Sequence, residues 1–160
     1  TPTVSNVTFL GDVALEESNY GLLLRRGFAP TLSNIAMSGF SSGCLAIRDQ
    51  ATYDSFAAGA SLTHSVAACA SPYEESEEES ETGTEEGIFE DGAASNRIVA
   101  DLLLTDAWTE ASPDFRPTGS SPLLSGGSAP DDAFFEAAAF VGAMDNTTDW
   151  TAGWTHHDAN

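Results

Sequence analysis

Two short segments recur along this chain at nearly constant spacing, and that spacing limits the folds it can adopt. Residues 4–9 (VSNVTF) align with residues 32–37 (LSNIAM) at an offset of 28, and residues 62–67 (LTHSVA) follow at a similar offset with a weaker match. A second pattern, GLLLRR at 21–26, aligns with GCLAIR at 43–48 at an offset of 22. A period of about 20–50 residues is typical of chains that stack one structural unit on the next.

The apolar residues within each copy are spaced as in β-strands. Val4, Val7 and Phe9 can point to one side while Ser, Asn and Thr face outward or occupy turns. No copy can bury its apolar face alone, so we expect successive copies to stack about 4.8 Å apart. We therefore predict an all-β fold, a short right-handed parallel β-helix (solenoid) of two to three turns with an irregular C-terminal cap. A β-sandwich with coincidental Ser-Asn pairs is the alternative.

Three N-terminal segments carry a resemblance to a known family: GLLLRRG at 21–27, LSNIAMSGF at 32–40 and SGCLAIRD at 42–49. They resemble the last turns of exported bacterial right-handed parallel β-helix proteins of the pectin-lyase-like type. The C-terminal segments resemble the cap of large uncharacterised proteins of that kind: FRPTGSSPLLSG at 115–126, FF at 134–135, VGAM at 141–144 and DWTAGWT at 149–155. The resemblance implies a fold and a cap. Enzymes of that family use Asp clusters with Arg or Lys on a strand face, and no such set is found here, so no activity is implied.

The chain divides near residue 111 in this interpretation. Residues 1–111 would form the solenoid turns, with an acidic loop inserted at 71–95, and residues 112–160 would form the irregular cap and tail. Four prolines between residues 113 and 130 interrupt regular structure. Residues 95–104 fit either a helix capped by Ser95 or a last strand. We favour the strand because the resemblance places one there.

The acidic loop concentrates Glu and Asp, with no base among them, between Glu74 and Asp91. Like charges repel, so we expect a solvated loop that faces a partner or a cation. A Ca²⁺ site is the sharper alternative, but the segment lacks the Asp-x-Asp-x-Asp-Gly pattern of an ordered calcium loop. In a third interpretation, Ile88 and Phe89 anchor the loop on a basic partner surface. The candidate residues are Glu74, Glu75, Glu77, Glu78, Glu79, Glu81, Glu85, Glu86, Glu90 and Asp91.

The two cysteines, Cys44 and Cys69, fall in successive copies. Neighbouring strands would place equivalent Cα atoms about 4.8 Å apart, within the usual range of about 4.4–6.8 Å for a disulfide. A disulfide and a pair of stacked thiols both fit this spacing. Two N-glycosylation triplets, NVT at 6–8 and NTT at 146–148, also fit an exported protein. We expect an extracytoplasmic location, either periplasmic or secreted.

The charge balance excludes several kinds of partner. The chain has 25 Asp and Glu against 5 Arg, no Lys and a net charge of −20, so it lacks the clustered cations that bind nucleic acid or anionic membranes. No apolar run approaches the roughly 18 residues of a membrane span, so no direct insertion is expected. Nucleophile elbows, phosphate-binding Gly loops and Cys/His metal spacings are missing from the sequence. We therefore expect no enzyme activity, no cofactor and no metal.

The remaining candidates are aromatic residues and histidines. Trp108, Trp150 and Trp154 could stack on a sugar, but we favour a role in pinning the C-terminal tail. His156 and His157 are weak metal candidates, and His64 is more typical of a hydrogen-bonded polar residue in a strand.

The function expected from these features is a non-catalytic, exported structural or accessory module. The chain begins directly at the first strand copy, so we expect either missing upstream turns or a protein partner at that end. Two alternatives stay open: the C-terminal part of a carbohydrate-binding or carbohydrate-cleaving β-helix, and low-affinity cation binding through the acidic loop.

Overall fold

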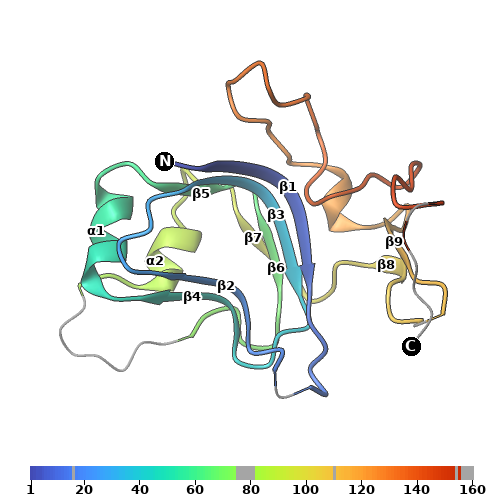
Figure 1. The fold of residues 1–160 in the computed structure, drawn as a ribbon, viewed down its shortest axis with the longest axis horizontal. Helices are drawn as coiled ribbons and strands as arrows, with labels where there is room; N and C mark the ends of the chain where they lie inside the picture. Colours follow the sequence, from blue (N-terminus) through green and yellow to red (C-terminus); the bar gives the residue numbers. More distant parts are fainter. Residues whose placement is uncertain (16, 75–81, 110, 154, 156–160) are drawn as a thin grey trace.

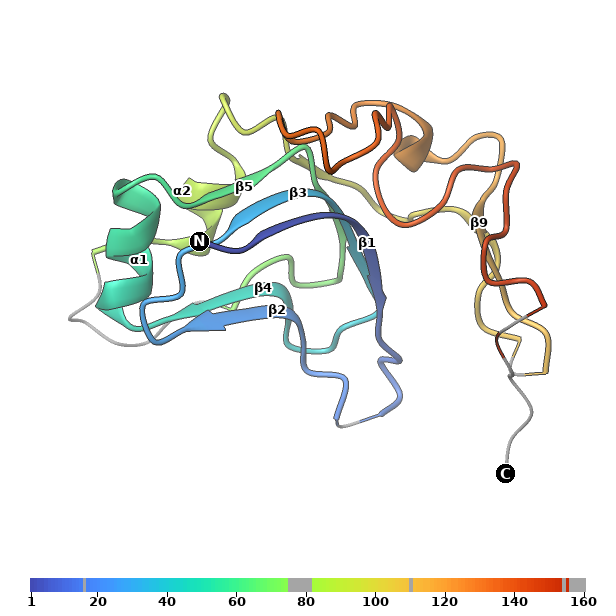
Figure 2. The same ribbon diagram turned by 45° about the horizontal axis from the view of Figure 1, so that its top comes forward.

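The fold is that of a computed structural model, which describes residues 1–15, 17–74, 82–109, 111–153 and 155. Two parallel sheets face each other, two helices lie at one end of them, and a long C-terminal segment lies beside the larger sheet (Figures 1 and 2). The elements in chain order are β1 (Thr3–Leu10), β2 (Tyr20–Arg25), β3 (Thr31–Ser38), β4 (Gly43–Arg48), α1 (Gln50–Ala57), β5 (Ser61–Thr63), β6 (Val66–Ala68), α2 (Glu85–Phe89), β7 (Arg97–Ile98), β8 (Leu104–Asp106), β9 (Asp114–Pro117) and the 3₁₀ helix η1 (Pro122–Leu124).

The larger sheet contains the strand copies that recur in the sequence. Its order is β1-β3-β6-β7, with β5 also paired to β3, and all of these pairs are parallel. Val4 lies opposite Leu32, and Leu32 lies opposite Leu62. Both alignments predicted for these copies are therefore confirmed as strand register.

The strands of this sheet bend at a column of residues with positive φ. Asn6, Asn34, His64 and Ser95 occupy equivalent positions in successive strand passages, with φ of 57°, 55°, 51° and 57°. A left-handed residue breaks the two-residue alternation of a strand. Leu32 and Ile35, three positions apart, can therefore enter the same core cluster. The column explains why the apolar spacing in the sequence is not strictly alternate.

The smaller sheet pairs β2 with β4, also in parallel. Leu22 lies opposite Leu45 and Leu24 opposite Ile47, so the predicted alignment of this pair is wrong by one position. Such a slip moves every side chain to the other face of a strand. Only the observed register places leucine on isoleucine within the buried cluster.

The helices close one end of the space between the sheets (Figure 2). The carboxylate of Asp49 accepts a hydrogen bond from the Thr52 amide at the start of α1, and the Thr84 hydroxyl accepts one from the Gly87 amide in α2. Tyr53 of α1 and Phe89 of α2 are buried in the same cluster as the strand residues. The helices thus complete the core as well as connect the strands.

The predicted all-β solenoid is wrong. The fold is mixed α/β, with open parallel sheets and interspersed helices. A solenoid repeats the same strands in every turn, whereas here the β2–β4 pair is continued only by an isolated bridge between Leu45 and Tyr73 in the part of the chain that the structure describes. Helix α1 follows β4 directly, where a solenoid would have a turn. Buried side chains of two short helices thus complete the core where a solenoid would add further strands.

The cysteine pair forms a disulfide, so the first of the two alternatives is confirmed. The Cys44 and Cys69 sulfurs are bonded, with their Cα atoms 5.7 Å apart. The bond links β4 to the residue that follows β6, and it therefore joins the two sheets. A disulfide of this kind is typical of oxidising, extracytoplasmic settings.

The C-terminal segment packs on the outer face of the larger sheet. Leu123 and Val141 form a second buried cluster with residues of that sheet, including Ala36 and Val66. The segment is less irregular than predicted, because β9 pairs with β8 in an antiparallel manner and η1 follows. The predicted last strand within residues 95–104 is confirmed by β7.

Candidate functional site

The described acids of the predicted loop do not converge on one point. Glu75, Glu77, Glu78, Glu79 and Glu81 lie outside the described residues. Within the described part of the chain, no group of three or more His, Cys, Asp or Glu side chains is placed to hold a metal ion. His156 and His157 also lie outside that part. Of the other acids, Glu74, Glu85, Glu90 and Asp91 make separate local contacts.

Glu74 belongs to a surface cluster with an arginine and a tyrosine. Its carboxylate accepts hydrogen bonds from the Arg48 guanidinium at 2.9 and 3.2 Å and from the Tyr20 hydroxyl. The hydrogen bond from Arg48 holds the pKa of Glu74 below its ordinary value, and the Tyr20 bond acts in the same direction. The bond to Glu74 conversely raises the pKa of Tyr20.

Glu85 is a buried carboxylate, with 3% of its surface exposed. Its Oε1 accepts a hydrogen bond from the Ile47 amide in β4 at 2.9 Å. Two residues earlier, the Leu45 amide donates to the Pro72 carbonyl at 3.0 Å, and the Leu45 carbonyl accepts from the Glu74 amide at 2.9 Å. The outer edge of β4 is therefore closed by a bridging segment and a side chain rather than by another strand.

Glu90 and Asp91 end the acidic segment near α2. Glu90 accepts a hydrogen bond from the Tyr73 hydroxyl at 2.9 Å, and burial together with this bond raises the pKa of Tyr73. Asp91 accepts one from the Ala93 amide at 3.0 Å. Glu86 is exposed on α2. Nothing in these contacts singles out a cation site.

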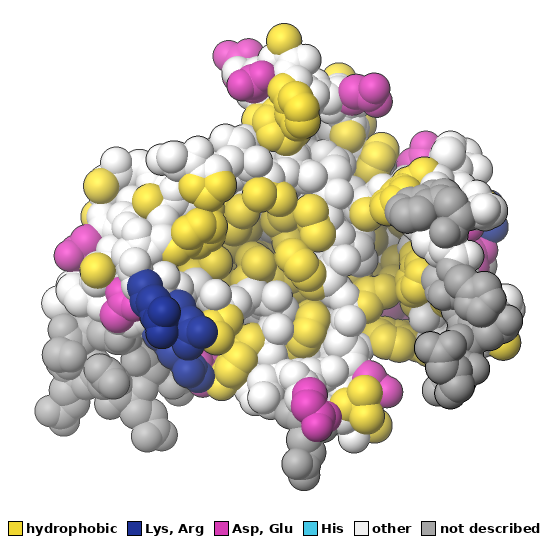
Figure 3. Space-filling model, in the orientation of Figure 1, with side chains coloured by type: hydrophobic (Ala, Val, Ile, Leu, Met, Phe, Trp, Pro, Cys, Tyr) yellow, Lys and Arg dark blue, Asp and Glu magenta, His cyan; other side chains and the backbone are white. Residues whose placement is uncertain are grey.

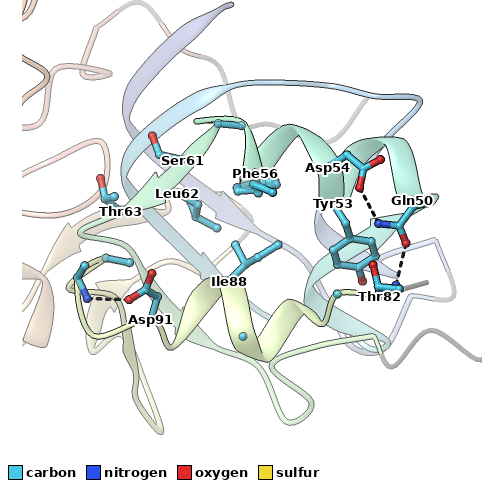
Figure 4. A pocket seen from close by; sticks show the side chains of 16 residues that line it. Gln50, Tyr53, Asp54, Phe56, Ser61, Leu62, Thr63, Thr82, Ile88 and Asp91 are labelled. Carbon is cyan, nitrogen blue, oxygen red and sulfur yellow. Dashed lines mark hydrogen bonds between the residues drawn. The ribbon is translucent and has the colours of Figure 1, made fainter.

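A pocket of about 440 Å³ lies between α1, α2 and β5 (Figure 4). Phe56, Leu62 and Ile88 supply its apolar lining, and Asp54 and Asp91 lie toward opposite ends (Figure 4). Gln50 bridges the Asp54 carboxylate and the Thr82 amide, at 2.7 Å each. Apolar lining with a few polar groups is typical of small-molecule pockets.

Of the three tryptophans, Trp108 and Trp150 are described, and neither lines this pocket. Trp108 and Trp150 are 58% and 50% exposed, and the Trp150 indole donates to the Ala143 carbonyl at 2.8 Å. This hydrogen bond joins two residues of the C-terminal segment, so it does not test the expected pinning of that segment to the strands. Trp154 lies outside the described residues.

Both parallel sheets end in an edge strand on the side of the core that lies opposite β7. Within the described residues, β1 pairs only with β3, and β2 pairs only with β4. Both β1 and β2 lie on the viewer's side in Figure 1, and the space-filling view shows apolar side chains over the same region (Figure 3). We call this surface the open face and define it by the edges of β1 and β2 with the side chains of Val4, Val7, Phe9 and Leu22.

The open face exposes residues that have buried equivalents one strand further in. Val7, Phe9 and Leu22 are half-buried and contact the core, whereas their partners Ile35, Met37 and Leu45 are at most 1% exposed. Val4 is 37% exposed, and its partner Leu32 is 5% exposed. The face thus presents one side of a core that continues behind it. Sequence reasoning expected a partner at this end, but it did not find the pocket, because the pocket depends on helices that were not predicted.

No protein-family model, curated protein or solved structure matches this chain. Membership of the pectin-lyase-like family therefore stays a prediction. The solenoid fold that this resemblance implied is wrong, as described above. No helix in the described ranges is long and apolar enough to cross a membrane.

Proposed function

We propose that this protein is a non-catalytic, exported accessory module that docks on a larger assembly through the open face. The observation that carries the proposal is the ending of both parallel sheets on one side, at β1 and β2. Unpaired strand edges offer a row of N–H and C=O groups, and a partner can satisfy them by adding a strand. The half-buried Val7, Phe9 and Leu22 would then be covered as their neighbours are.

The contrast with the far edge of the smaller sheet supports the same conclusion. The outer edge of β4 is closed by the Tyr73 bridge and by the Glu85 carboxylate. The outer edge of β2 has no comparable cover among the residues that the structure describes. An uncovered strand edge is a template on which a further strand can pair. The disulfide supports export to a periplasmic or secreted location.

Site-specific photocrosslinking tests the docking. A benzophenone amino acid in place of Val4 or Leu22, in the full chain within producing cells, should give one discrete adduct with another protein. The same probe in place of Phe134, which is 85% exposed in the C-terminal segment, is the control and should give none. Equal or absent adducts at all three positions would exclude docking through the open face.

The alternative of glycan binding would use the pocket between α1 and α2 rather than the tryptophans. Its mixed apolar and polar lining is the supporting observation. Failure of the purified protein to bind any member of a glycan array would exclude this alternative.

A further inference from the structure

The five arginines of this chain differ in whether their side chains have partners among the described residues. Three have partners: Arg48 pairs with Glu74 at 2.9 Å, Arg116 with Asp114 at 2.7 Å, and Arg97 donates to the carbonyls of Pro122 and Ser125. Arg25 and Arg26 are exposed, and no ion pair within the described ranges involves either guanidinium. The Asp49 carboxylate accepts a hydrogen bond from the Arg26 backbone amide and is therefore close to this pair. Two adjacent guanidiniums without an ion pair in the described ranges are nevertheless unexpected in a chain that carries 25 acids.

These two arginines lie at the margin of the open face. Arg25 is the last residue of β2, and Arg26 follows it. Figure 3 shows Arg side chains over this end of β2, beside the apolar area. Arg25 is also in register with Arg48 on β4, so two like charges are stacked on neighbouring strands. Like charges in such positions are destabilising unless a counter-charge lies close by.

The structure already contains a solution to this problem one strand further in. Tyr73 bridges to Leu45 on the outer edge of β4, and the next residue, Glu74, places its carboxylate on Arg48. A backbone segment that runs parallel to β4 therefore supplies both edge pairing and a counter-charge. Arg25 occupies the position on β2 that Arg48 occupies on β4. The outer edge of β2, however, has no neighbouring strand among the described residues.

We propose that the segment docking on the open face is a strand of a different protein that adds in parallel to β2 and brings carboxylates to Arg25 and Arg26. This inference rests on the proposed docking function and names the chemistry of the partner. The strand has apolar residues at alternate positions to cover Leu22 and the core beside it, and Asp or Glu where it passes the end of β2. In a parallel arrangement these acids lie in its C-terminal half.

The charge of the whole molecule narrows the partner further. A net charge of −20 repels extended polyanions, so nucleic acid does not fit the arginine pair. A locally acidic strand fits, because its contact with two guanidiniums is short-range and is shielded from distant charges by salt. A second copy does not fit, because a symmetric contact would bring its own two arginines against this pair.

The experiment uses the full chain with the benzophenone probe at Leu22, added to the extracellular and envelope fraction of producing cells. Arg25→Gln, Arg26→Gln and the double variant are compared with Arg116→Gln, which removes one charge from the C-terminal segment. We expect the double variant to lower the adduct yield about tenfold at about 0.15 M salt, where distant charges are screened, and Arg116→Gln to leave it unchanged. Salt at about 0.5 M should lower the yield of the wild type but not that of the double variant. Mass spectrometry should place the crosslink in an apolar segment with Asp or Glu in its C-terminal half.

The outcomes separate this inference from the function on which it rests. No adduct at Leu22 in any form would overturn the docking function itself. An adduct with the same yield in the double variant, or one mapped to a segment without acids, would leave docking intact and overturn the strand with carboxylates. An adduct of twice the mass of this chain would identify a second copy and would also overturn it.

Discussion

Asn34 is the residue on which the larger sheet and the C-terminal segment meet. It is fully buried, with a φ of 55°. Its Oδ1 accepts a hydrogen bond from the Ser128 amide at 2.8 Å, and its Nδ2 donates to Asn6 Oδ1 at 3.2 Å. Its backbone carbonyl accepts from the Gly142 amide at 2.9 Å. One asparagine thus connects neighbouring strands and holds the segment that covers them.

Replacing Asn34 should separate its backbone role from its side-chain role. Asn34→Ala loses the hydrogen bonds and puts a side chain that disfavours the left-handed region at that φ, so we expect a loss of about 2–4 kcal/mol in unfolding free energy. Asn34→Gly keeps the conformation and should be about 1 kcal/mol less destabilising. Urea unfolding followed by circular dichroism measures both. Equal stabilities of the Ala and Gly variants would contradict the role of the left-handed backbone.

Glu74 gives the protein a defined pH dependence. Because its pKa is below the ordinary value in the folded state, its contribution to stability is present above the unfolded pKa of about 4.5 and is lost as the pH falls through the lower folded pKa. The wild type should therefore lose its advantage over Glu74→Gln between about pH 5 and pH 3. Urea midpoints of both proteins across this range test the difference. A constant difference at every pH would show that the Arg48 contact does not stabilise the charged form.

At this scale the sequence could indicate residue types but not partners. Strand spacing predicted that Cys44 and Cys69 lie close together, but a disulfide and stacked thiols fitted that spacing equally well. The contact of Glu74 with Arg48 could not be predicted, because it depends on the bridge between Tyr73 and Leu45, which are far apart in the sequence. Glu85 was grouped with solvated acids, yet its side chain is buried on a strand amide.

At the scale of elements, α2 is positioned by that same buried carboxylate. Glu85→Ala would leave the Ile47 amide without an acceptor in a buried site, so we expect a loss of about 1–3 kcal/mol in unfolding free energy. Glu85→Gln keeps a carbonyl oxygen at the same position and should retain more than half of that stability. Hydrogen exchange of the Ile47 amide, read together with urea unfolding, is the measurement. Unchanged protection of this amide in Glu85→Ala would contradict the contact.

The strands of the larger sheet were predictable, whereas the helices were not. The strand copies carry their register in recurring residues, such as Val4 with Leu32, and the structure follows those offsets. Helices α1 and α2 are short, with too few turns to produce a clear apolar period. The capping residues Asp49 and Thr84 were the available signals. The one-position error between β2 and β4 arose because the glycines, rather than the core residues, were aligned.

At the scale of the whole molecule, parallel stacking was inferred correctly and the class of fold was not. Recurring strands indicate that neighbours stack, but they do not show whether every turn contains the same elements. Here α1 takes the place of a turn after β4, and the Tyr73 bridge takes the place of a strand in the third passage of the chain. The sequence also led us to expect a partner at the first strand, and the proposed function keeps that expectation by placing the partner on the open face.

The disulfide gives the molecule a mechanical property. Because Cys44 and Cys69 are bonded across 25 positions of sequence, tension applied to the two ends of the chain passes through the sulfur atoms and bypasses the residues between them. About 85 Å of contour length, at roughly 3.4 Å per residue, stays out of the extended chain until the bond is reduced. Helix α1 and strands β5 and β6 lie within that span. In a chain pulled from both ends, these elements are therefore not extended while the bond is intact.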